Sequence, residues 1–236
     1  MPIVTPALAL SLLALSPTVS PNRAAESKVD EIVVTALSKP LTLNSKELTR
    51  AVKAYHKLRA VYAPQSQLLF QIVGAAGSDR RVLEDLKLTL RSKEGSVPVP
   101  IDADRRFTLP GSVGKGWTLI ANRRVGFGIL PVVLSPGTGT SDRLLGDLRL
   151  QCEVQWAMAK PDLSIVMRAT ASAFGGFCKG SVLPFFEWSD RAIASASVSA
   201  GALIRPVYVT EDRMAYRAPV HDKNLPHSAR VRVRYR

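Results

Sequence analysis

Few side chains in this 236-residue sequence have types and spacings that could support chemistry. His221 and Asp222 are adjacent, and His227 follows in the same proline-flanked loop. Asp222 could orient an imidazole, or the group could join Asp212 in a metal site. A solvated loop is the alternative. No nucleophile elbow, zinc-protease motif or phosphate loop accompanies these residues. The sequence therefore favours a non-catalytic protein that needs no cofactor. One alternative is an enzyme acting on an anionic envelope polymer through His221 and Asp222. Another is a subunit held in a larger envelope assembly by strand addition.

The two cysteines, Cys152 and Cys178, have the spacing of a disulfide rather than of a metal site. Two thiols with no neighbouring His or further Cys cannot complete a zinc shell. In an exported protein they should be joined, and the bridge would stabilise the fold by about 3 kcal/mol on the chain-entropy model. The alternative is a pair of buried, reduced thiols in the cytosol.

Cys152 lies in a segment, Asp147 to Trp156, in which even positions are apolar and odd positions polar. This period of two is typical of a strand with one buried face. A helix is the alternative, and its apolar stripe would consist of Leu145, Leu148, Cys152, Trp156 and Ala159. The helix would leave Leu150 and Val154 on the opposite face, so we expect a strand.

The composition indicates a folded chain with many turns. Hydrophobic residues make up 46% of the sequence and charged residues 22%, which are ordinary globular values. Sixteen Pro and fifteen Gly are spread along the chain, as expected for turns between short strands. We predict a mainly β, β-sandwich-like fold with one or two short helices, and α+β is the alternative.

Residues 1–25 are predicted to be a signal peptide. The apolar run 3–15 has the length of a secretory h-region and is too short to span a bilayer. No Lys or Arg precedes it and no A-x-A cleavage site follows it, and a buried helix interrupted by Pro6 is the alternative. We expect export to the periplasm or the exterior of a Gram-negative envelope, with no transmembrane span in the mature chain.

Residues 26–45 are expected to be an extended N-terminal segment. Within it, Asp30–Ala36 reads Asp-Glu-Ile-Val-Val-Thr-Ala and resembles the TonB box of TonB-dependent outer-membrane receptors. In that family the box adds as a strand to the periplasmic TonB domain. The resemblance implies partner binding by Ile32, Val33, Val34 and Thr35. It covers only this heptapeptide, and the absence of a plug domain and of room for the barrel excludes receptor function. A β-branched first strand is the alternative.

Residues 46–63 should form an amphipathic helix. Asn44 and Glu47 have the spacing of a capping box, and Pro64 ends the pattern. The apolar stripe consists of Leu48, Val52, Tyr55, Leu58 and Tyr62. We expect this stripe to pack on the domain and the lysines to face water, and the alternative is a basic helix lying on an anionic membrane.

The first β region spans residues 65–136. Its expected strands are 67–73, 86–91, 97–101, 106–110, 117–122 and 128–134. A Val-Pro-Val-Pro strand, an Asp-rich turn and Phe-Thr-Leu-Pro resemble the transthyretin-like modules of secreted carboxypeptidases, over roughly 65–125. The resemblance implies a small β-sandwich with a structural or ligand-presenting role. Arg105 or Arg106 replaces the turn glycine of that family.

The second β region spans residues 142–236 and contains both cysteines. A short helix should run from Leu163 to Phe174 with Asp162 as its N-cap. The strands expected after it are 181–188, 192–199, 202–209, 214–217 and 229–236.

The last strand alternates arginine with Val231, Val233 and Tyr235. Its arginines, Arg230, Arg232, Arg234 and Arg236, would stand in a row about 6.8 Å apart. They could contact anions, or they could protect a terminal edge strand from pairing with other chains. A net charge of +13 favours polyanion partners such as lipopolysaccharide or an acidic polymer, or else serves only solubility. No aromatic-and-basic module indicates specific nucleic-acid binding.

Overall fold

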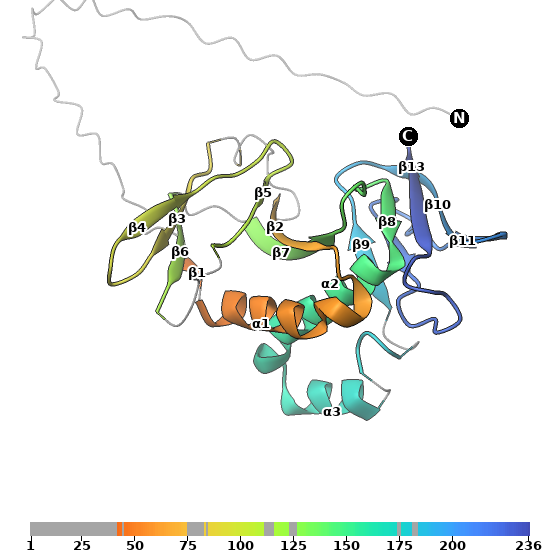
Figure 1. The fold of residues 1–236 in the computed structure, drawn as a ribbon, viewed down its shortest axis with the longest axis horizontal. Coiled ribbons are helices and arrows are strands. Elements are labelled where there is room, and N and C mark those ends of the chain that lie inside the picture. The colour runs from red at the N-terminus through yellow and green to blue at the C-terminus, as the bar shows by residue number, and fades with distance from the viewer. Residues whose placement is uncertain are drawn as a thin grey trace, which may run out of the picture. The chain divides into compact units, whose positions relative to one another are not determined.

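The computed structural model describes residues 42–43, 45–74, 83, 85–110, 116–122, 127–173, 176–180 and 184–236. All of these belong to one unit, Ser38–Arg236, and the description below concerns that unit. The predicted signal peptide and the segment from Ile32 to Thr35 lie outside the described residues. The strands form antiparallel sheets and outnumber the helices, so the mainly β prediction is confirmed (Figure 1).

The first β region contains two sheets, and all of their strands except β1 match the predicted ones within a few residues. Strand β1 lies before this region, in the part of the chain expected to be an extended segment. One sheet has the order β5–β2–β7, with bounds Arg106–Phe107, Gln67–Gly74 and Phe127–Leu134. The other has the order β1–β6–β3–β4, with bounds Thr42–Leu43, Thr118–Ala121, Leu88–Arg91 and Ser96–Val99. In β3 the alternation is visible as burial, because Leu88 and Leu90 face the core.

Helix α1, Ser45–Tyr62, forms where the sequence predicted it. Leu48, Ala51 and Tyr55 are buried in the core of the first region, while Lys53 and Lys57 are exposed. The helix therefore packs its apolar stripe on the domain, as expected.

The second β region also contains two sheets. One has the order β11–β10–β13–β8, with bounds Leu203–Val207, Ile193–Ala200, Arg230–Tyr235 and Asp142–Leu144. The other is the ribbon β12–β9, formed by Ala215–Ala218 and Phe185–Trp188.

Strand β13 is an interior strand, so the terminal edge strand considered from the sequence is wrong. It pairs with β10 along its length and with β8 from Arg230 to Arg232. Beyond β8, the N–H of Val233 donates to the carbonyl of Ser141. Protection of a free edge therefore cannot explain its arginines.

The strand predicted over Asp147–Trp156 is wrong, because this segment belongs to helix α2, Leu145–Ala159. Every residue from Leu145 to Cys152 is buried. A helix enclosed on all sides has no solvent-facing polar stripe, so its sequence lost the period of 3.6 that would have identified it. The polar side chains at alternate positions are buried as well, so the period of two that they produce does not mark a side of the helix that faces solvent.

Helix α2 lies between two hydrophobic clusters. Leu150 and Val154 belong to the cluster formed with α1 and the first β region. Leu145, Leu148 and Cys152 belong to the cluster formed with the second β region. The apolar residues that seemed misplaced on a helix therefore each have a core to face.

The second predicted helix is α3, Ile165–Ala173. Its N-terminal cap is not Asp162, because the Ser164 hydroxyl accepts a hydrogen bond from the N–H of Met167 at 3.2 Å. Asp162 instead ends a short 3₁₀ turn, Lys160–Asp162, and pairs with Arg50 of α1.

Candidate functional site

The arginines of β13 share a sheet face with the serines of β10. Arg232 pairs directly with Ser197, and Arg234 pairs with Ser195. Directly paired residues of antiparallel strands point to the same face of the sheet. We call the four residues Ser195, Ser197, Arg232 and Arg234 the arginine–serine face. The other side of β13 carries Val231 and Val233, which are buried as predicted.

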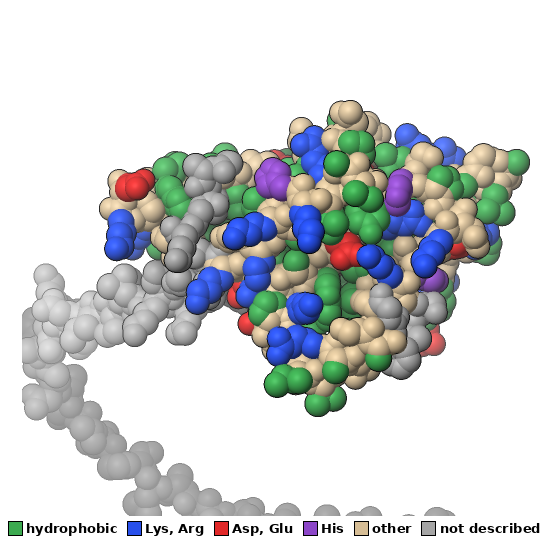
Figure 2. Space-filling model, turned by 60° about the horizontal axis from the view of Figure 1, so that its bottom comes forward, with side chains coloured by type: hydrophobic (Ala, Val, Ile, Leu, Met, Phe, Trp, Pro, Cys, Tyr) green, Lys and Arg blue, Asp and Glu red, His purple; other side chains and the backbone are tan. Residues whose placement is uncertain are grey.

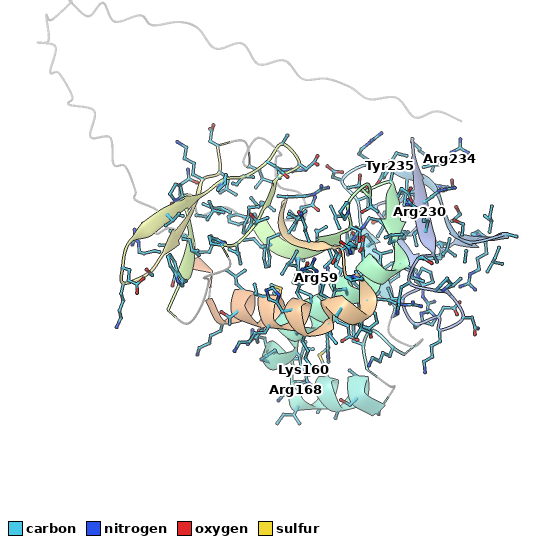
Figure 3. The ribbon with its side chains drawn as sticks, in the orientation of Figure 1. Arg59, Lys160, Arg168, Arg230, Arg234 and Tyr235 are labelled. Atoms are coloured by element: carbon cyan, nitrogen blue, oxygen red, sulfur yellow. A yellow bond between two sulfur atoms is a disulfide. The ribbon has the colours of Figure 1, made fainter. Side chains whose placement is uncertain are left out.

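The arginines of this strand differ in their partners. Arg230 donates from Nη1 to Asp142 Oδ2 at 2.6 Å, so its charge is partly neutralised. Arg232, Arg234 and Arg236 are exposed, and none has an ion-pair partner among the described residues. Tyr235 lies between them, with its hydroxyl donating to the Thr140 carbonyl, and Figure 3 shows Arg230, Arg234 and Tyr235 on this strand.

The chemistry of this face suits anionic groups. A guanidinium presents several N–H donors in a planar fork that matches carboxylate and phosphate oxygens. The serine hydroxyls beside it are further donors and are too short to cover it. The face can therefore bind anions by charge-assisted hydrogen bonds, and it contains no acid or base suited to catalysis.

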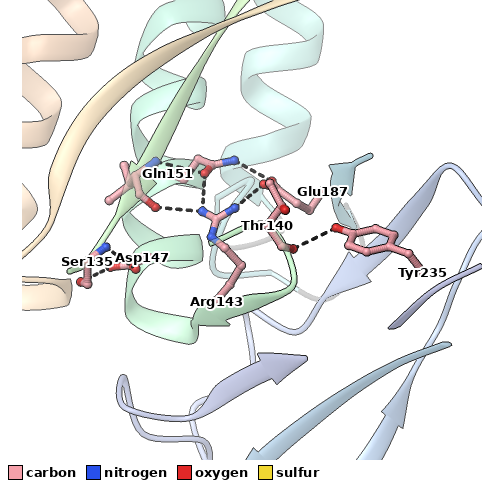
Figure 4. Close-up of polar contacts among 8 residues, drawn as sticks. Ser135, Thr140, Arg143, Asp147, Gln151, Glu187 and Tyr235 are labelled. Carbon is pink, nitrogen blue, oxygen red and sulfur yellow. Dashed lines mark hydrogen bonds and ion pairs between the residues drawn. The ribbon is translucent and has the colours of Figure 1, made fainter. Parts of the chain in front are cut away.

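A buried polar network connects β7, β8, α2 and β9, and it was not predicted from the sequence (Figure 4). Among the described strands, β7 has a neighbour on only one edge, and side chains of α2 and β8 bond to its other edge. Gln151 Oε1 accepts from the Val133 N–H at 3.2 Å, and Arg143 donates to the Val133 carbonyl at 2.8 Å. Asp147 accepts from both the N–H and the hydroxyl of Ser135, at 2.8 and 2.7 Å.

Glu187 of β9 connects this network to the second β region. Its carboxylate accepts from Arg143 Nη1 at 2.5 Å and from Gln151 Nε2 at 2.6 Å. Burial, the largest single effect, lowers the pKa of Arg143, but the charges of Glu187, Tyr216 and Asp147 and the hydrogen bond to Glu187 together outweigh it, so the pKa is raised overall. Burial raises the pKa of Asp147 despite its bonds to Ser135. Most polar groups of the network bond to one another, while Arg143 Nε is buried with no hydrogen-bond partner among the described residues.

The sequence did hold a signal for this network that we did not use. Asp147, Gln151 and Gln155 are spaced four residues apart, which places them in one row along a helix. Residues four apart are neighbours on a helix but not along a strand, so the strand prediction hid this row.

His221 and His227 line one cavity of about 540 Å³, together with Arg149, Glu153, Lys179 and Lys223. Burial, with nearby arginines, lowers the pKa of both histidines. Burial raises the pKa of Glu153. Three cations, Arg149, Lys179 and Lys223, line the cavity together with one carboxylate, Glu153, and this balance favours an anionic occupant.

Arg149 of α2 holds the loop that forms this cavity. Its guanidinium donates to the carbonyls of Val220, Asp222 and Leu225. It also lies 2.8 Å from His227 Nδ1, which must accept because arginine has only donors. His227 therefore cannot use Nδ1 as a free base.

The sequence suggested that Asp222 could orient the His221 imidazole, but the Asp222 carboxylate bonds to other groups. The Asp222 carboxylate accepts hydrogen bonds from Arg205 and from the Asn224 N–H. These bonds lower the pKa of Asp222, and the bond from Arg205 has the largest effect. Asp212 accepts from Thr210 and Met214 instead of joining the histidines, and no group of metal-ligating side chains occurs among the described residues.

The cysteines come together as predicted, with Cys152 Sγ 2.06 Å from Cys178 Sγ. Cys152 lies on the fully buried part of α2, and Cys178 lies in the turn after α3. The pair therefore connects α2 to this turn.

A second cavity, of about 530 Å³, lies beside the polar network. The β2–β7 sheet contributes Leu130 and Val132 to it, and β9 contributes Phe186 and Trp188. Arg105 and Asp190, also among its lining residues, form an ion pair at 3.1 Å. Arg105 has a φ of 60°, a conformation that favours glycine, and it is one of the two positions at which the transthyretin-like turn glycine is replaced.

Comparisons with known proteins returned nothing: no family model, no curated protein and no solved structure matches this chain. None of the helices in the described part of the chain is both long and apolar enough to cross a membrane.

Proposed function

We propose that this chain is a non-catalytic, exported envelope protein that binds an anionic polymer through its arginine–serine face. The observation that carries the proposal is the exposure of Arg232 and Arg234 beside serines. Neither arginine has an ion-pair partner among the described residues, and Asp142, which lies opposite Arg232, is paired with Arg230. The net charge of +13 supports it, because a positive field raises the local concentration of polyanions. The predicted signal peptide and the paired cysteines support export.

A polymer fits this face better than a small anion does. The face is the outer surface of a sheet, whereas sites for small ligands are concave. Arg232 and Arg234 are two residues apart on one strand, so their backbones are separated by about 6.8 Å. A chain with repeated anionic groups can bind both guanidinium groups at once and gain from the second contact without a second association step. Lipopolysaccharide phosphates and acidic polysaccharides have this chemistry.

The test is salt elution from immobilised heparin, followed by titration with lipopolysaccharide. We expect R232A/R234A to elute at lower salt and to bind about tenfold more weakly, a loss of about 1.4 kcal/mol. The control is R91A/K93A, which removes the same charge from exposed positions at the β3–β4 turn.

If the two double variants lose the same affinity, net charge alone explains the binding, and the proposed face is refuted. Wild-type protein that does not bind either polymer would refute polyanion binding altogether. Circular dichroism establishes that both variants are folded.

An enzyme acting on an anionic polymer is a second candidate, favoured by one observation. His221 and His227 share a cavity with Glu153 and the cations Lys179 and Lys223. An activity on such a polymer that is lost in folded H221A, but kept in R232A/R234A, would favour the enzyme. Activity that is unchanged in H221A would remove this role for the cavity.

A further inference from the structure

Helix α3 exposes three consecutive large hydrophobic side chains. Ile165, Val166 and Met167 are 76%, 73% and 57% exposed, and Ala171 is the helix's buried residue. A helix that served only the fold would turn its apolar residues toward the core. Figure 1 shows α3 beyond α1, away from the sheets. Contiguous exposed apolar side chains of this kind indicate a site of interaction.

Basic side chains surround this apolar group. Lys160 precedes α3 and Arg168 lies within it, and both are on the side of the molecule that carries Arg59 (Figure 3). Neither Lys160 nor Arg168 has an ion-pair partner among the described residues. Figure 2 brings this side forward and shows hydrophobic and basic side chains gathered there, with few acidic ones.

Helix α1 adds a cationic stripe on the same side. Arg50 bonds to the Met158 carbonyl and to Asp162, which places this side of α1 against the connection between α2 and α3. Lys53 and Lys57 follow Arg50 at i+3 and i+7, so they lie in one row with it. Both lysines are exposed.

We propose that this surface docks on an anionic lipid bilayer. Ile165, Val166 and Met167 would enter the headgroup boundary, and Lys53, Lys57, Lys160 and Arg168 would contact lipid phosphates. An apolar group ringed by cations has the arrangement of interfacial helices, which combine apolar burial with electrostatic attraction. A helix of nine residues cannot span the bilayer, so the contact is peripheral. This surface is separate from the arginine–serine face and does not depend on its function.

The test is co-sedimentation of the full chain with phosphatidylcholine vesicles, with and without phosphatidylglycerol. We expect binding only when the anionic lipid is present. I165S/V166S should weaken it about tenfold without changing the net charge, and K53A/K57A should weaken it as well. The matched control is L203S/I204S, which replaces side chains 48% and 71% exposed at the β10–β11 turn.

If I165S/V166S and L203S/I204S lose the same vesicle binding, docking through α3 is refuted. Wild-type binding that does not depend on phosphatidylglycerol would also refute it. A lipid-free dimer that I165S/V166S dissociates would assign the face to a second copy of the chain and overturn the proposal. I165S/V166S should keep its retention on heparin, whereas R232A/R234A should keep its binding to vesicles. The two proposals can therefore fail independently.

Discussion

Arg143 holds a positive charge inside the protein, with its side chain 2% exposed and bonded to Glu187. Removing water from both ions is costly, and the pair is tolerated because Val133 and Gln151 satisfy further Arg143 donors. Mutation of one member of the pair therefore affects stability differently from mutation of both. Loss of one partner leaves the other charge buried and unpaired, which costs much more than loss of both.

We therefore expect Glu187→Gln to lower the free energy of unfolding by about 3–5 kcal/mol. The combination with Arg143→Met should cost less than the sum of the two single changes, by about 1 kcal/mol or more. Urea denaturation of the four proteins measures this coupling. Additive losses would show that the ion pair contributes nothing of its own.

Asp147 makes stability depend on pH, since its pKa is raised by burial in the folded state. A folded-state pKa above the unfolded value means that the folded protein binds the proton more tightly. The contribution is therefore complete at acid pH and is lost as pH rises through the folded-state pKa. Relative to Asp147→Asn, which cannot ionise, the wild type should lose stability as pH rises above about 4, the ordinary pKa of an aspartate. Parallel denaturation curves measure this, and a stability difference that does not change with pH would contradict it.

At the scale of elements, α2 begins where it nearly touches α1. A Cβ on Gly146 would lie 2.2 Å from the Tyr62 carbonyl oxygen and 3.1 Å from His227 Cβ. Helix propensity alone predicts that Gly146→Ala stabilises by about 1 kcal/mol. We expect the opposite sign, a loss of about 2 kcal/mol or more, because backbone must move apart. Thermal unfolding distinguishes the two signs. Gly139→Ala is the control, because nothing lies near the added Cβ there and, as at Gly146, φ is not positive.

The same helix shows what the sequence could and could not predict. Strands with one solvated face, such as β3 and β10, and helix α1 carry their period in their own residues, and they were predicted within a few positions. The predicted cap of α1, Asn44, lies outside the described residues. The environment of α2 is made by two cores that are distant in sequence, and the roles of Arg149 and Gln151 depend on backbone groups brought to them by the fold. The arginine row of β13 was visible in the sequence, but its serine neighbours on β10 were not, because pairing between strands is a property of the sheet.

At the scale of the molecule, α2 joins two hydrophobic clusters that would otherwise be separate cores. Each cluster takes several buried residues from the helix, so unfolding either one exposes apolar surface of α2 and removes support from the other. Arg143 of β8 also links the two regions, because it bonds to the Val133 carbonyl of β7 and to Glu187 of β9. We therefore expect the two clusters to unfold as one cooperative unit rather than as two domains.

Tryptophans placed in the two clusters can test this cooperativity. Trp117 packs against the first cluster and Trp156 against the second, whereas Trp188 is largely exposed. The variant W156F/W188F leaves a probe of the first cluster, and W117F/W188F leaves a probe of the second. In each variant, the fluorescence transition in urea should have the same midpoint as the transition in far-ultraviolet circular dichroism. If instead one tryptophan reports a midpoint well separated from the circular dichroism of its own variant, the clusters are independent, and α2 does not couple them.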